Sequence, residues 1–172
     1  TTTAFRPTSQ SSRTVAAASA FGITTAFDVQ VNLEDLHAYA TLRDKGDLTV
    51  RMRIALYHPR ETPRQRYPEF EAARARYLDD WMVVAAVKLY IDGVQESGTA
   101  ALLEPYANDP HSKGSTVYDV EEFRSVVTDL DRRGFQICTH ACGDRGVRIA
   151  LDAYEAASRA NATKGRRHRV EH

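Results

Sequence analysis

The sequence predicts an α/β protein built from parallel strands, and its spacing carries this prediction. Short apolar, β-branched runs alternate with amphipathic helical segments, and the runs recur about every 30 residues, the period of βαβ units. Five such units fit five-eighths of a TIM-type (β/α)8 barrel, with a doubly wound, flavodoxin-like sheet as the alternative. Strands are expected near 22–29, 49–57, 82–91, 135–141 and 167–172.

A titratable residue stands at or just beyond the end of every expected strand. These residues are Asp28, His58, Lys88 with Asp92, His140 with Asp144, and His172. A doubly wound sheet concentrates its ligand site at one crevice, whereas a barrel gathers the carboxyl ends of all its strands around one mouth. The distribution therefore favours the barrel, and we expect a single partial domain over residues 1–172.

Capping residues and closing glycines mark the helices expected between the strands. These helices cover about 9–20, 32–46, 63–80, 119–134 and 144–157. The pattern of the third is weak. Asp119 and Glu122 form a capping box at the start of the fourth, and Asp144 is placed as the N-cap of the last. The loop 92–118 is far longer than a usual connection of roughly 4 to 6 residues, so we expect a substrate-facing lid.

The composition excludes several classes of function. Lys plus Arg and Asp plus Glu each number 23, so no net charge calls for nucleic acid or an anionic membrane. No apolar run approaches the length of a membrane span. Cys138 and Cys142 flank a histidine, which favours a reducing compartment or a metal over a secreted disulfide scaffold. A cytoplasmic protein is expected.

Lys88 lies in the most apolar run of the chain, residues 81–91, where an ammonium group is costly. One interpretation is a lysine that extends its amine out of the barrel mouth or pairs with Asp92. The functional interpretation is a desolvated, neutral amine that has reacted with carbon dioxide. The resulting carbamate is an anionic, two-oxygen bridge suited to two divalent cations about 3.5 to 4 Å apart.

His140 and His172 end adjacent strands and offer imidazoles of the kind that zinc, nickel or iron prefers. A rival arrangement puts Cys138, His140 and Cys142 on one strand face as a closed zinc site, although structural zinc sites usually draw on CxxC pairs. We expect Asp144 to cap its helix first and to support ligands second. Asp28 and His58 are expected to line the site without taking part in chemistry.

Four runs stand in the order and spacing of a known set of motifs: VKLYIDG (87–93), TAALLEPY (99–106), THACGDRGV with ALDAYE (139–155) and RHRVEH (167–172). Together they resemble the amidohydrolase superfamily, in its branch of YtcJ-like hydrolases and N-substituted formamide deformylases (amidohydrolase family 3). The resemblance implies a (β/α)8 barrel that hydrolyses amide-type C–N bonds of small molecules with one or two metal ions, zinc foremost.

By this resemblance, Lys88 is the carbamylated bridging ligand, His140 and His172 are metal ligands at the fifth and sixth barrel strands, and a metal-bound hydroxide attacks the substrate carbonyl. Asp92 and Asp144 would contact substrate or support the ligands. The family's first-strand His-x-His pair and last-strand aspartate, its general base, are absent from this sequence. We therefore expect a central barrel fragment that has little activity alone.

Such a fragment has two unpaired strand edges, so we expect it to self-associate or to bind the remainder of its barrel. The competing hypothesis is a non-catalytic α/β binding or assembly module in which Lys88, His140 and His172 are structural.

Overall fold

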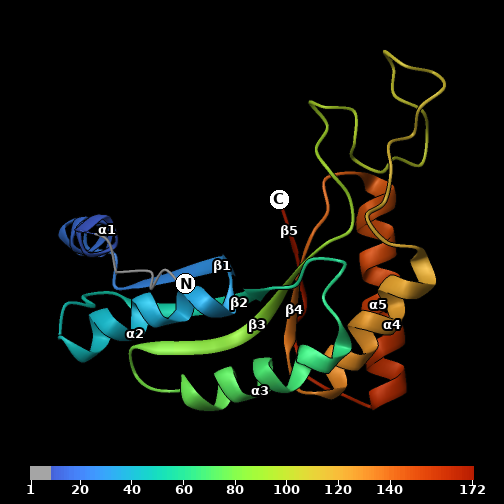
Figure 1. Cartoon of the computed structure of the whole chain (residues 1–172). Coiled ribbons are helices and arrows are strands. Elements are labelled where there is room, and N and C mark those ends of the chain that lie inside the picture. Colours follow the sequence, from blue (N-terminus) through green and yellow to red (C-terminus); the bar gives the residue numbers. More distant parts are fainter. Residues whose placement is uncertain (1–8) are drawn as a thin grey trace, which may run out of the picture. The chain divides into compact units, whose positions relative to one another are not determined.

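The computed structural model describes residues 9–172, which form two compact units (Figure 1). The first unit contains the described residues up to Tyr57 together with Pro63–Ala85, and the second contains His58–Thr62 and Ala86–His172. Residues 1–8 of the expected domain lie outside the described residues.

Five strands form one sheet in the order β1-β2-β3-β4-β5. They are β1 Thr25–Val31, β2 Arg51–Tyr57, β3 Met82–Tyr90, β4 Gln136–His140 and β5 Arg169–Glu171. A spatial order equal to the chain order is that of a barrel, whereas a doubly wound sheet reverses its order at a switch point. The predicted fold class, α/β units of a TIM-type barrel, is confirmed, and the flavodoxin-like alternative is wrong.

Most strands begin one to three residues later than expected, and for β1 and β5 the reason is local. At the end of the first helix, the backbone N–H of Ile23 donates to Ala18 and that of Gly22 to Ser19, a helix-terminating pattern that uses the residues before β1. Gly22 has a φ of 77°, which suits a glycine at this position. Before β5, Arg167 has a φ of 53°, so the strand starts only at Arg169.

The first unit contains the helices α1 Ser9–Ala20, α2 Leu36–Asp44 and α3 Tyr67–Arg76, with 3-10 turns at Leu33–Asp35 and Arg64–Arg66. The weakly patterned segment 63–80 is therefore partly turn and partly helix. α3 buries Tyr67, Phe70 and Ala73, spaced three apart, while most of its other side chains are charged. Because only this narrow stripe of α3 is apolar and buried, the amphipathic pattern of the segment is weak in the sequence.

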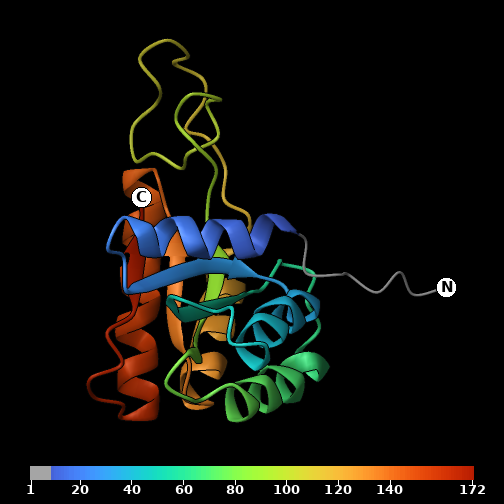
Figure 2. The ribbon, with the colours of Figure 1, turned by 90° about the vertical axis from the view of Figure 1, so that its left-hand side faces the viewer.

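The second unit contains α4 Val120–Arg132 and α5 Asp144–Asn161, which lie side by side in both ribbon views (Figures 1 and 2). The long loop 92–118 extends from the end of this unit at which α5 begins and at which the C-terminus lies (Figure 1). The carboxyl ends of β3, β4 and β5 therefore share one end with the loop, as barrel topology requires. No helix within residues 9–172 has the length and apolar character needed to cross a membrane.

The predicted N-cap of α5 is wrong by one residue: the cap is Gly143, and Asp144 is already helical. The carbonyl oxygen of Ala101 accepts the backbone N–H of Arg145 and of Gly146, which are orphan donors at the helix start. A Cβ atom at position 143 would lie 2.0 Å from that same carbonyl oxygen. Only glycine permits this approach, so the N-cap position belongs to Gly143, and a distant loop supplies the acceptor for the first backbone donors of the helix.

Candidate metal centre

Lys88 is fully buried in β3, and its Nζ has no hydrogen-bond partner within residues 9–172. The two non-catalytic interpretations of this lysine, an amine that reaches solvent and an ion pair with Asp92, are both wrong. The side chain does not extend into solvent, and the carboxylate of Asp92 is occupied elsewhere. Nζ lies instead 4.9 Å from the centroid of the Tyr90 ring. Burial lowers the pKa of Lys88, and the carboxylate of Glu171 opposes that shift.

Asp92 is also buried, with 1% of its surface exposed, and its carboxylate accepts three backbone hydrogen bonds. Oδ2 accepts the N–H of Ala101 at 2.9 Å and that of Gly143 at 2.8 Å, and Oδ1 accepts the N–H of Cys142 at 3.0 Å. The carboxylate thus joins the loop after β3 to the turn after β4. It is not available to contact a substrate.

His140 ends β4, where its ring stacks on Tyr90 with centroids 4.6 Å apart. Its Nε2 lies 2.8 Å from the carbonyl oxygen of Gly93. Because a carbonyl oxygen only accepts, this bond requires the hydrogen on Nε2 and leaves the lone pair on Nδ1. Nδ1 is therefore the nitrogen of His140 that is able to bind a metal ion.

His172 lies against His140, with ring centroids 4.8 Å apart. Burial lowers the pKa of His172, and Lys88 and His140 add to the shift. The structure therefore brings together the three residues that the sequence proposed as ligands, and Tyr90 contacts both Lys88 and His140. Tyr90 was missed, although its position two residues after Lys88 places both side chains on one strand face.

The rival site of Cys138, His140 and Cys142 is not formed. Cys142 Sγ lies 3.5 Å from Nε2 of His140, the nitrogen that carries the hydrogen. Cys138 lies in register with Lys88, and burial raises the pKa of its thiol to about 12. Among residues 9–172, no group of three or more His, Cys, Asp or Glu side chains is placed to hold a metal ion. A metal here therefore needs a further donor, and the orphaned amine of Lys88 fits that requirement once it carries a carboxyl group.

The remaining predicted residues have other contacts. Asp144 is exposed, and its Oδ1 accepts the backbone N–H of Leu103 at 2.8 Å. Asp28, in the first unit, accepts the hydroxyl of Tyr39 at 2.6 Å. His58 donates its backbone N–H to the carbonyl oxygen of Lys88. Asp144 thus secures the base of the long loop, and the backbone of His58 is held by β3.

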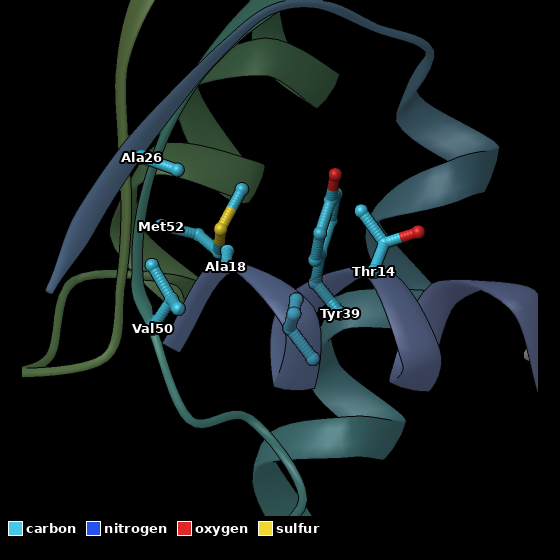
Figure 3. Close-up of a pocket in the computed structure, with 7 residues that line it drawn as sticks. Thr14, Ala18, Ala26, Tyr39, Val50 and Met52 are labelled. Atoms are coloured by element: carbon cyan, nitrogen blue, oxygen red, sulfur yellow. The ribbon is translucent and has the colours of Figure 1, made fainter. Parts of the chain in front are cut away.

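A separate pocket of about 240 Å³ lies in the first unit, between α1, α2 and the first two strands (Figure 3). It is lined by Thr14, Val15, Ala18, Ala26, Tyr39, Val50 and Met52. The lining contains no charged residue, and its one phenol is engaged by Asp28. This pocket lowers the packing density of the first unit, but its lining lacks the groups that hydrolysis requires.

A buried polar network in the second unit was also missed. Asp131 accepts hydrogen bonds from Asn161 at 2.8 Å, Thr163 at 2.9 Å and Nε2 of His168 at 3.1 Å, while Nδ1 of His168 accepts the backbone N–H of Ile137. Its members are separated by some thirty residues in the chain, so no local pattern reveals it.

Comparison with known proteins places this chain in a family. A model described as "Amidohydrolase family" matches residues 11–172. The chain is 30% identical over 141 residues to "Protein LONG AFTER FAR-RED 3" of Arabidopsis thaliana, covering 82% of this chain and 23% of that protein. It is 28% identical over 128 residues to "Putative amidohydrolase YtcJ" of Bacillus subtilis (strain 168), covering 74% and 22%.

A crystal structure of an uncharacterized metal-dependent hydrolase from Pyrococcus furiosus superposes with a TM-score of 0.70 at 25% identity, covering 86% of this chain and 31% of that one. The chain thus spans about a quarter of the length of the curated relatives and about a third of the solved structure. The family match extends over both units and includes Lys88, His140 and His172. The chain belongs to the amidohydrolase family.

Proposed function

We propose that the protein to which this chain contributes is a metal-dependent hydrolase of non-peptide C–N bonds, of amide or formamide type, in small molecules. Membership of the amidohydrolase family supports hydrolysis. The name of the Bacillus relative and the metal dependence ascribed to the Pyrococcus hydrolase support the bond type and the metal. Because the chain spans under a third of either, we assign catalysis to the whole protein, with the general base outside these 172 residues.

One observation carries the proposal: within residues 9–172 the buried amine of Lys88 has no hydrogen-bond partner, and it lies against Tyr90 near two imidazoles. Carbamylation resolves this burial. The Nζ lone pair of Lys88 forms an N–C bond with carbon dioxide, and the nitrogen releases a proton to solvent. A neutral buried amine thereby becomes an anion with two oxygen donors. The lowered pKa of Lys88 supports this step, because only the neutral amine reacts.

The carbamate of Lys88, Nδ1 of His140 and the ring of His172 would hold one or two divalent cations, with zinc suited to this donor set. A bound cation polarises a substrate carbonyl and lowers the pKa of a water molecule. The chain's own residues orient the ligands: the Tyr90 ring supports His140, and the Gly93 carbonyl fixes its tautomer. Asp144, exposed at the start of α5, is the candidate for substrate contact. The free thiols of Cys138 and Cys142 support a cytoplasmic location.

The test is hydrolysis of N-formyl and N-acyl amines by the full-length protein. Lys88→Ala and His140→Ala should each lower kcat/KM by at least about 100-fold, because carbonyl polarisation by a metal ion contributes several kcal/mol. Lys45→Ala, at an exposed lysine after α2, is the matched control and should leave the rate unchanged. Rates unaffected by all three substitutions would contradict the assigned site.

A non-catalytic role has its own signature. Protein expressed with ample zinc would then contain no metal by elemental analysis, and Lys88→Ala and His140→Ala would leave that result unchanged.

A further inference from the structure

We infer that Asp92 and Gly93 are positioning residues for His140: together they fix which nitrogen of that ring faces the metal. The inference rests on the proposed function, because it assumes that His140 binds a metal ion, but the contacts that support it are separate from those that support the proposed function. It assigns to Asp92 a task that differs from substrate contact and to Gly93 a task that no sequence motif reveals.

The first step concerns the free-energy cost of burying the Asp92 carboxylate. Its carboxylate is buried, and within residues 9–172 it makes no ion pair with a lysine or an arginine; its nearest cationic candidate is Nε2 of His140, 3.8 Å away. An unpaired buried carboxylate is expensive unless several donors stabilise it. Here three backbone N–H groups do so, and all three belong to the loop after β3 or to the turn after β4.

The second step is the space around the carboxylate, which glycines provide. A Cβ atom at Gly93 would lie 2.0 Å from Thr99 Oγ1, and one at Gly146 would lie 2.5 Å from Asp92 Oδ2. With Gly143, whose Cβ would meet Ala101, three glycines let the two segments close around one side chain. These close approaches leave no room for a side chain at the three positions, so the junction depends on glycine there.

The third step connects this junction to His140. Asp92 and Gly93 are consecutive, so the carboxylate that holds the turn after β4 also fixes the peptide that presents the Gly93 carbonyl. That carbonyl accepts Nε2–H of His140 at 2.8 Å, and the Tyr90 ring holds the imidazole from its face. Ligating histidines are commonly oriented through their second nitrogen, and loss of the orienting partner weakens metal binding roughly 10- to 100-fold.

The first experiment reads the tautomer directly, by long-range ¹H–¹⁵N correlation NMR of histidine-labelled chain without added metal. The wild-type chain should show His140 with its hydrogen on Nε2. Asp92→Asn turns one acceptor oxygen into an NH₂ group that opposes a backbone donor, so it should give a mixture of tautomers. Gly93→Ala keeps the Asp92 carboxylate but displaces Thr99 and the carbonyl group of residue 93, so it should also give a mixture of tautomers. This variant replaces Asp92→Asn in the experiment if Asp92→Asn does not fold.

The matched control is Asp144→Asn. This carboxylate, at the start of α5, also accepts two backbone N–H groups, from Leu103 in the long loop and from Arg145 in the helix, but it holds no residue next to His140. Both Asn variants should lower the thermal unfolding midpoint, whereas only Asp92→Asn should change the His140 tautomer. An unchanged Nε2–H tautomer in both Asp92→Asn and Gly93→Ala would overturn the inference and leave Asp92 a purely structural residue.

The second experiment measures zinc affinity of the full-length protein by competition with a chelator. Asp92→Asn should weaken zinc binding roughly 10- to 100-fold, and Asp144→Asn should not. Equal affinities in wild type and Asp92→Asn would overturn the inference even if the tautomer changes. A wild-type protein that binds no zinc would instead contradict the proposed function, because the tautomer is read without metal.

Discussion

Nε2 of His140 donates its hydrogen to the carbonyl oxygen of Gly93 across 2.8 Å. The bond links the end of β4 to the loop after β3 and leaves Nδ1 as the free nitrogen of the ring. Lys88, whose buried amine has no hydrogen-bond partner within residues 9–172, and His172, in ring contact with His140, are the other two nitrogen donors of the proposed site. A site of this kind needs its ligands held before any ion arrives, and the backbone of the two loops supplies that order.

The first prediction concerns acid stability. Burial lowers the pKa of His168, although the negative charge of Asp131 opposes this shift. The pKa of Asp131 is also lowered, because hydrogen bonds from Asn161 and Thr163 outweigh the effect of its burial. Both groups therefore bind protons more tightly when unfolded, so the stability they contribute is complete above the ordinary histidine pKa of 6.5 and is lost as pH falls below it. Protonated His168 also loses Nδ1 as the acceptor for Ile137.

Chemical denaturation between pH 7 and pH 4 checks this prediction. The wild-type free energy of unfolding should fall with pH, and His168→Gln should flatten the part of the curve just below pH 6.5. His111→Gln, at an exposed histidine of the long loop, is the control and should keep the wild-type slope. An identical slope in all three proteins would show that His168 does not contribute to the pH dependence of stability.

The second prediction concerns the apolar pocket of the first unit. Ala26 points into it from β1 (Figure 3), so Ala26→Val adds methyl groups to empty space and suits a strand. The free energy of unfolding should rise by about 0.5 to 1 kcal/mol. Val50→Ala, which enlarges the same pocket at a buried position, should lower it by about 1 kcal/mol or more. Destabilisation by Ala26→Val would mean that the pocket is closed in solution.

The third prediction concerns association. β1 and β5 are the terminal strands of the sheet, and the first unit exposes large apolar side chains, with Phe21 at 86% and Trp81 at 44%. Exposed strand edges and apolar area promote pairing. The 172-residue chain should therefore dimerise or aggregate in light scattering, and Phe21→Ser with Trp81→Ser should shift it toward smaller species. A monodisperse 19.2 kDa monomer would contradict the prediction.

The sequence was sufficient for the fold class because two local signals agree: the alternation of apolar runs and helices indicates parallel units, and a titratable residue at every strand end favours a barrel over a doubly wound sheet. Lys88 was equally visible, since one charge in an apolar strand contrasts with all its neighbours. The start of α5 was misplaced because its cap is the Ala101 carbonyl, forty residues or so away in the chain. The role of Gly93 was invisible for a related reason: every residue has a carbonyl, and only the fold shows which one meets a histidine.

Asp92 shows the limit most clearly. Its place after a ligand-bearing strand suggested contact with substrate or support of ligands, and residue type alone does not separate the two. Burial and three backbone donors argue against substrate contact and underlie our inference that Asp92 positions His140.

The central claim is that Lys88 is a carbamylated metal ligand, and ¹³C NMR of protein equilibrated with ¹³C-labelled bicarbonate tests it most directly. We predict a carbamate resonance in the full-length wild-type protein that gains intensity when zinc is added and is absent in Lys88→Met, while Lys45→Met retains it. A wild-type spectrum without this resonance, with and without zinc, would contradict the claim.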